Sequence, residues 1–136
     1  MNNRNSKPKL IALVDDETTL DQIIQAARAY YEVIPARDPL WAAAWLSQYR
    51  DVTVFVASQR LAGSNVALFY RAQAMRNDVM RVMLTSKSEQ IRFANIVAQG
   101  TINKLLIEPF EDSELLDVIC LESAGVEDSP NSSVAG

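Results

Sequence analysis

Hydrophobic residues along the chain follow two alternating patterns. The first is a short, almost continuous apolar run, typical of a strand buried on both faces of a parallel sheet. These runs span residues 9–14, 32–36, 54–57, 79–86 and 102–107. The second pattern has apolar residues at helical spacing, over residues 18–31, 38–49, 65–75, 88–100 and 111–123. We therefore predict five strand–helix units.

Strict alternation of strands and helices favours a parallel sheet with helices on both faces. Five units fit an α/β, flavodoxin-like (βα)5 three-layer sandwich whose five-stranded sheet has the order 2-1-3-4-5. Pro35, which lacks an N–H donor, indicates that the second strand lies at a sheet edge or ends there. Thr18, three residues before Asp21, is the expected cap of the first helix.

The second predicted helix carries two tryptophans. Asp38 is its expected N-cap and Pro39 its first residue. Its apolar stripe is expected to consist of Leu40, Trp41, Ala44 and Trp45. We expect both tryptophan rings to be buried, and the alternative is that one ring is exposed as an interaction anchor.

Composition and charge narrow the class of protein. A chain of 136 residues is long enough for one domain with a well-formed core, and its net charge of −4 without a basic stripe argues against nucleic-acid binding. The apolar run at 10–14 is too short to span a membrane, so we expect a cytoplasmic location and no membrane contact. Polar, small-residue ends predict disorder over 1–8 and 125–136, which leaves a folded domain at 9–124.

Residues that usually carry catalysis are scarce. The chain has no histidine, and therefore no conventional general base or zinc ligand, and its one cysteine, Cys120, is expected to be inert packing in the last helix. It also lacks a glycine-rich phosphate loop, which argues against a nucleotide cofactor. We therefore do not expect an enzyme.

Polar residues follow the predicted strands, where sheets of this kind place their ligand sites. Asp15 and Asp16 follow the first strand and Ser58 follows the third, while Thr85 and Glu108 stand at the ends of the fourth and fifth. The two aspartates could hold Mg²⁺, or they could simply begin the next helix, whose dipole favours negative charge. Taken alone, the pair favours the second interpretation.

Four short motifs occur at these strand ends: "LVDDE", "SQRLAGSN", "MLTS" and "LLIEPF". In this order and at this spacing they resemble the motifs of response-regulator receiver domains of bacterial two-component signalling, over residues 9 to about 122. The resemblance implies the fold predicted above and a signalling role.

Carried over residue by residue, the resemblance indicates a degenerate site, that of a pseudo-receiver. The family's metal-binding acidic pair falls on Asp15 and Asp16, and its switch hydroxyl falls on Thr85. Ser58 stands in place of the phosphate-accepting aspartate, and Glu108 in place of the lysine that contacts the phosphoryl group.

Two further positions depart from the family pattern. The switch aromatic falls on Leu105 and the loop proline on Ala62. We expect Leu105 to be a core residue, and we expect Thr85 to satisfy a backbone group instead of moving together with a ring.

These departures change the expected chemistry. A serine hydroxyl without a base is a poor nucleophile, so we expect no phosphorylation by the family mechanism, no required cofactor and weakened Mg²⁺ binding at Asp15 and Asp16. Two unit charges about 6 Å apart interact by roughly 3 kcal/mol at an effective dielectric near 20. Glu108 should therefore acquire a proton, a metal or a basic partner, or turn to solvent. The candidate basic partners are Arg60, Lys87 and Lys104.

Receivers that this chain resembles often pair or signal through their last two helices and the strand between them. Here that surface would carry Arg92, Asn95, Gln99, Lys104 and Asp112. The alternative is that these residues form an ordinary solvated face.

Three functions remain open. The favoured one is a stand-alone receiver-like module that acts by phosphorylation-independent protein–protein contact with a histidine kinase, another response regulator, an effector or a second copy of itself. The second is a receiver still regulated by Mg²⁺ or by unconventional phosphorylation. The third and weakest is a small Mg²⁺-dependent phosphatase, for which only the segment "DDETT" speaks.

Overall fold

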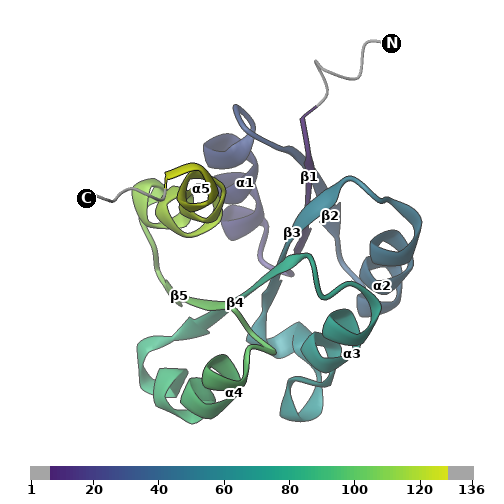
Figure 1. The fold of residues 1–136 in the computed structure, drawn as a ribbon. Helices are drawn as coiled ribbons and strands as arrows, with labels where there is room; N and C mark the ends of the chain where they lie inside the picture. The colour runs from purple at the N-terminus through teal and green to yellow at the C-terminus, as the bar shows by residue number, and fades with distance from the viewer. Residues whose placement is uncertain (1–6, 129–136) are drawn as a thin grey trace.

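The computed structural model describes residues 7–128 and the side chains of residues 7–120, so the expectations for 1–6 and 129–136 lie outside the described residues. Five parallel strands form one sheet in the order β2-β1-β3-β4-β5 (Figure 1), which confirms the predicted topology. The strands are β1 (Lys9–Leu13), β2 (Glu32–Ala36), β3 (Val52–Ser58), β4 (Met80–Ser86) and β5 (Lys104–Glu108). The helices are α1 (Glu17–Ala27), α2 (Pro39–Gln48), α3 (Ala67–Met75), α4 (Ala94–Gln99) and α5 (Asp112–Asp128).

Helices cover both faces of the sheet: α1 and α5 pack on one face, and α2, α3 and α4 on the other (Figure 1). Alternate residues of β1 serve the two cores. Leu10 and Ala12 pack under α1 and α5, whereas Ile11 and Leu13 pack under α2 and α3, and all four are fully buried. A strand covered on both faces needs apolar residues at every position, which explains the continuous runs. Pro35 lies in the edge strand β2, as predicted.

The two helices on one face of the sheet, α1 and α5, differ in length from the predicted helices. α1 ends at Ala27 instead of residue 31, and the N–H groups of Tyr30 and Tyr31 both donate to the Ala27 carbonyl at 2.9 Å in the turn that follows. The Tyr31 ring is buried and its hydroxyl donates to the Ile119 carbonyl at 2.9 Å, so core packing overrides the helical pattern there. α5 continues to Asp128, since no proline stands between Pro109 and Pro130 to end it, and it therefore takes in part of the expected tail.

The predicted helix 88–100 is wrong in its first half. Lys87–Phe93 is a 3-10 helix, and α4 begins only at Ala94. In a 3-10 helix side chains three positions apart eclipse each other, and Glu89 and Arg92 use this spacing to form an ion pair. The outer face of this segment carries polar and apolar side chains alike, and Ile91 is 81% exposed.

α3 also begins later than predicted, at Ala67 instead of residue 65. Asn65 and Val66 have φ angles of 54° and 50°, in the left-handed region that β-branched residues rarely adopt. The Val66 side chain is 2% exposed, and its burial under α2 and α3 accounts for this conformation.

α2 faces the sheet differently from the prediction. Asp38 is its N-cap, as expected, and accepts from the Leu40 N–H at 2.7 Å. The buried residues, however, are Ala42, Ala43 and Leu46. Leu40 is 68% and Trp41 59% exposed, and Trp45 is partly buried against the core. The small alanine side chains let the helix approach the sheet closely, which leaves the bulky stripe outside.

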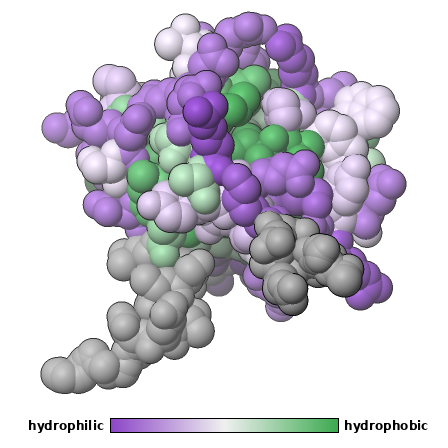
Figure 2. All heavy atoms as spheres, turned by 90° about the horizontal axis from the view of Figure 1, so that it is seen from above, coloured by the Kyte–Doolittle hydropathy of each residue, from purple (hydrophilic) through white to green (hydrophobic). Residues whose placement is uncertain are grey.

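Two arginines tie loops together at the amino ends of the strands. Arg81, which is 3% exposed, donates to the backbone carbonyls of Val79, Gly100 and Thr101 at 2.8–2.9 Å. Arg76 donates to the carbonyls of Leu46, Tyr49 and Val52 at 3.0–3.1 Å. These contacts fix the loops before β3, β4 and β5 without a buried carboxylate. Seen from above, the surface of the molecule is mostly hydrophilic, with smaller hydrophobic areas between the hydrophilic ones (Figure 2).

Candidate functional site

The carboxyl ends of four neighbouring strands meet at one edge of the sheet. Asp15 and Asp16 follow β1, Ser58 ends β3, Thr85 lies near the end of β4, and Glu108 ends β5. The strand register places Ser58 beside Leu84 and Ser86 beside Glu108 in the sheet. The residues singled out in the sequence therefore lie around one edge, which we call the acidic edge: Asp15, Asp16, Ser58, Thr85 and Glu108.

Ser58 lies at the centre of the acidic edge. It is 3% exposed, and its hydroxyl has no hydrogen-bond partner among the described residues. A 3-10 turn, Gln59–Ala62, follows it directly. A buried hydroxyl without a hydrogen-bonded base keeps its proton, so this group is not an activated nucleophile.

Asp15 is engaged by an arginine of that turn. Arg60 donates to the two Asp15 carboxylate oxygens through Nη2 at 2.7 Å and Nε at 3.3 Å. This contact lowers the pKa of Asp15 and raises that of Arg60. Of the three basic residues that the sequence offered, Arg60 is the one that reaches the acidic edge.

Asp16 serves the backbone of α1. Its Oδ2 accepts from the Thr19 N–H at 3.0 Å and from the Thr19 hydroxyl at 2.6 Å, and both bonds lower the pKa of Asp16. Asp16, and not Thr18, is therefore the N-cap. The prediction of Thr18 is wrong because the helix begins at Glu17, so that Thr18 lies inside it and the cap is two residues earlier. For Asp16 the helix-start interpretation of the acidic pair is confirmed.

Glu108 is half-buried at the end of β5. Burial raises the pKa of its carboxyl, Arg60 lowers it, and the nearby Asp16 and Asp15 raise it further. The charge conflict predicted from the sequence is thus eased by Arg60, while the raised pKa shows that burial and the neighbouring carboxylates still disfavour the charged form of Glu108. Lys87 and Lys104 form no ion pair with Glu108 in the described part of the chain. The Glu108–Pro109 peptide bond is cis.

Thr85 is 2% exposed and is held by a side chain rather than by a backbone group, so the predicted backbone role is wrong. Its hydroxyl donates to Gln59 Oε1 at 2.6 Å, and Gln59 Nε2 donates to Glu89 Oε1 at 3.3 Å. Glu89 is also paired with Arg92. Four side chains from three segments thus form one polar chain, from Thr85 to the surface at Arg92.

Gln59 and Glu89 were missed in the sequence. The only signal for Gln59 was its position directly after Ser58, in the loop that carries Arg60. Because consecutive residues of this turn point to different strands, Gln59 reaches toward β4 and Arg60 toward β1. Leu105 is half-buried and packs against the core under α2 and α3, as a core residue should.

The acidic edge does not have the form of a metal site. The described residues contain no group of three or more His, Cys, Asp or Glu side chains that could hold a metal ion. Mg²⁺ at the aspartate pair would have to compete with Arg60 for Asp15 and with Thr19 for Asp16. The residues present therefore fit Mg²⁺ poorly.

The predicted interaction face is exposed. Its members Arg92, Asn95, Gln99, Lys104 and Asp112 all lie at the surface. Arg92 lies over the Phe93 ring at 5.2 Å from its centroid, and Gln99 accepts from the Tyr70 hydroxyl at 3.5 Å. Exposure alone does not separate a docking face from a solvated one, so this assignment stays a prediction.

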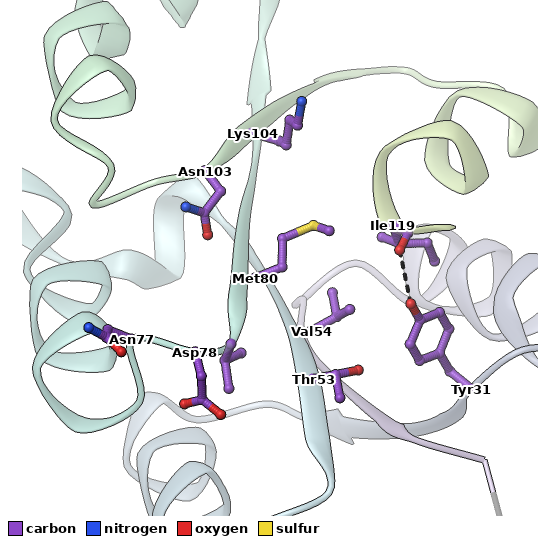
Figure 3. Close-up of a pocket in the computed structure, with 10 residues that line it drawn as sticks. Tyr31, Thr53, Val54, Asn77, Asp78, Met80, Asn103, Lys104 and Ile119 are labelled. Carbon is purple, nitrogen blue, oxygen red and sulfur yellow. Dashed lines mark hydrogen bonds between the residues drawn. The ribbon is translucent and has the colours of Figure 1, made fainter. Parts of the chain in front are cut away.

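A hollow of about 530 Å³ lies at the opposite end of the sheet, near the amino ends of β3, β4 and β5 (Figure 3). Val54 and Met80 form an apolar floor, and Figure 3 shows Asp78 and Lys104 at its rim. Asp78 is already paired with Arg76 at 3.0 Å. No residue of the acidic edge lines this hollow.

The similarity of this chain to known proteins was found through its structure. No protein-family model matches it, and no curated protein matches its sequence. An uncharacterized protein from Neptuniibacter caesariensis superposes with a TM-score of 0.77 at 17% identity, covering 93% of this chain and 98% of that one.

Two further solved structures are a signal receiver domain and a response regulator. The signal receiver domain of an HD domain-containing protein from Pseudomonas fluorescens Pf-5 matches with a TM-score of 0.71 at 23% identity, over 88% of each chain. The chemotaxis response regulator CheY4 of Vibrio cholerae matches with a TM-score of 0.73 at 19% identity, over 85% of this chain and 98% of that one. The chain has the fold of response-regulator receiver domains. Within residues 7–128, every helix is too short or too polar to cross a lipid bilayer.

Proposed function

We propose that this chain is a receiver-like signalling module of a two-component type pathway, which acts by protein–protein contact and is not phosphorylated at Ser58. Its partner would be a histidine kinase, another response regulator or an effector. The observation that carries the proposal is the ion pair between Arg60 and Asp15, because a side chain of the protein itself occupies the carboxylate that a metal would need.

The nucleophile position also speaks against phosphoryl transfer. Attack on phosphorus by Ser58 would release a proton, and no residue that the structure describes is hydrogen-bonded to the hydroxyl as a base to take it. The incoming phosphoryl group is an anion, and at the acidic edge it would meet three carboxylates against one guanidinium. Transfer of a phosphoryl group depends on positive charge that neutralises the moving oxygens, and here the balance is negative.

The polar chain from Thr85 supports a single, fixed conformation. A switch hydroxyl must be able to change its partner, and the Thr85 hydroxyl is buried and bound to Gln59 at 2.6 Å. Leu105, which packs in the core, has no polar tip with which to follow such a movement. We therefore expect the surface at Arg92 to have the same form whether or not a phosphodonor is present.

Labelling with a small-molecule phosphodonor tests the proposal. The protein is incubated with acetyl phosphate and Mg²⁺, and its intact mass is measured beside that of a Ser58→Asp/Glu108→Lys variant. We expect no added phosphate on the natural chain. Stoichiometric labelling of the natural chain at Ser58, Asp15 or Asp16 would overturn the proposal and favour a receiver regulated by unconventional phosphorylation.

Metal and partner binding complete the test. Backbone amide NMR spectra are recorded during Mg²⁺ titration, and we expect no shifts around the acidic edge at millimolar metal. The natural chain and the double variant are then used to capture partners from the native cell. Equal partner sets indicate a contact that does not depend on the acidic edge, whereas a metal-dependent set would contradict the proposal.

A further inference from the structure

α2 is apolar on two opposite faces. Its inner face, Ala42, Ala43 and Leu46, is buried against the sheet. Its outer face, which we call the α2 stripe, consists of Leu40, Trp41, Ala44 and Trp45. Positions i, i+1, i+4 and i+5 lie along one side of a helix. A helix that is apolar all round is usually buried on both sides, and this one is buried on one.

The exposed apolar area is concentrated on this stripe. Leu40 and Trp41 are 68% and 59% exposed and adjacent, whereas the other large exposed hydrophobic residues of the described chain are scattered on separate elements. Single exposed apolar residues are common on soluble proteins, and contiguous ones mark contact sites.

The tryptophans are arranged as a rigid anchor. The rings of Trp41 and Trp45 are 5.9 Å apart between centroids and tilted by 45°, and Trp45 also packs against the core. Trp41 is thus supported from one side while its other side is open to solvent. A large ring that is already held in place loses little conformational freedom on binding, which favours it as the centre of an interface.

Charges at the two ends of α2 indicate what covers the stripe. Asp38 lies just before the helix and Arg50 just after it, both are exposed, and neither forms an ion pair within the described residues. Each is six positions from Ala44, the small residue in the middle of the stripe. An antiparallel, two-fold contact with a second α2 would centre on Ala44 and place each Asp38 opposite the other copy's Arg50.

We propose that α2 is a homodimer interface, in which the α2 stripes of two copies pack antiparallel across Ala44. The contact is isologous, so every charge pair is formed twice. Arg37, next to Asp38, is already paired with Glu17 at 2.8 Å, so its charge does not oppose the contact between the two copies. The dimer leaves the predicted interaction face around Arg92 free, so that one dimer presents two copies of it. This proposal does not depend on the proposed function.

The strength of the dimer follows from its size. A contact between two ten-residue helices buries less than the roughly 1,600 Å² of a standard interface. We therefore expect a weak, concentration-dependent dimer. Sedimentation velocity from about 10 µM to about 1 mM should show the natural chain changing from monomer to dimer.

Single substitutions can show whether the dimer forms through α2 or through another surface. Trp41→Glu should weaken dimerisation at least ten-fold, and Ile91→Glu, at an even more exposed position on the 3-10 segment before α4, should not. Both positions are exposed, and far-UV circular dichroism of each variant checks that it is folded. A natural chain that stays monomeric to about 1 mM, or dimers weakened by Ile91→Glu and not by Trp41→Glu, would overturn the proposal.

Cross-linking tests the geometry. In a Cys120→Ser background, Ala44→Cys should form a disulfide-linked dimer under mild oxidation, because Ala44 lies on the two-fold axis. Asn95→Cys, on the exposed side of α4, is the matched control and should stay monomeric. Linkage at position 95 alone, at both positions equally, or at neither would contradict an α2 interface centred on Ala44.

Discussion

Replacing Arg60 by methionine isolates the contact on which the proposed function rests. The Arg60 and Asp15 side chains are 67% and 41% exposed, so water screens much of their attraction. Exposed ion pairs contribute about 0.2–1 kcal/mol, and we expect Arg60→Met to lower the free energy of unfolding at pH 7 by no more than about 1 kcal/mol. The local charge changes much more than the stability, because the acidic edge loses its cation.

The pKa values give the sign of this effect. Arg60 lowers the pKa of Asp15 in the folded protein, so the pair stabilises the fold above the ordinary value of 3.8 and this stabilisation disappears as the pH falls through the folded pKa. The difference in stability between natural chain and variant should therefore be present at pH 7 and vanish in strong acid. The pKa values of Asp15 and Glu108 should both rise in the variant, since Arg60 lowers each of them.

Urea unfolding at several pH values measures the stability, and carbon-detected NMR titration measures the two carboxyl groups. Arg92→Met is the matched control: its side chain is 61% exposed and also paired with a glutamate, but that pair lies away from Asp15. A loss above about 2 kcal/mol for Arg60→Met, or unchanged pKa values for both carboxyl groups, would refute the reasoning.

Three further predictions concern single positions. Glu108→Gln should stabilise the protein at neutral pH, because the raised pKa of Glu108 means that its charged form is disfavoured on folding, and the gain should vanish below the ordinary value of 4.5; urea unfolding across pH measures it. Arg81→Met should lower the free energy of unfolding by about 3–5 kcal/mol, since it leaves buried carbonyls unpaired, whereas exposed Arg71→Met should change it by less than about 0.5 kcal/mol. Asp16→Ala should lower the melting temperature more than Thr18→Ala, and Asp16→Ser should restore most of the loss, because serine also caps helices.

The spacing of apolar residues predicted the central strands correctly, because a strand that is buried on both faces must be apolar at every position. The runs at 9–14 and 79–86 became β1 and β4 because a central parallel strand has no solvent face. The stripe on α2 failed for the opposite reason. A helix with alanine and bulky apolar residues on all sides has two candidate inner faces, and its own pattern does not choose between them.

At the acidic edge too, the sequence was sufficient for one feature and insufficient for another. The chain order of strands and loops was sufficient to bring Asp15, Ser58 and Glu108 to one edge of the sheet. It was not sufficient to assign their partners, because Arg60, Lys87 and Lys104 have similar reach and charge. Gln59 was missed because an amide has no charge to mark it, and its role depends on Thr85 lying within 2.6 Å.

The spacing of apolar residues was sufficient to predict the five alternating strand–helix units, and their number favoured the sheet order that the structure has. The spacing of apolar residues is a local property of the chain, which folding does not alter. The packing of strands and helices was needed to show that Arg60 binds Asp15, that Asp16 caps α1 and that Trp41 faces solvent. Those outcomes depend on which side chains lie within hydrogen-bonding or packing distance of one another. Such distances between residues far apart in the sequence are set only when the strands and helices pack.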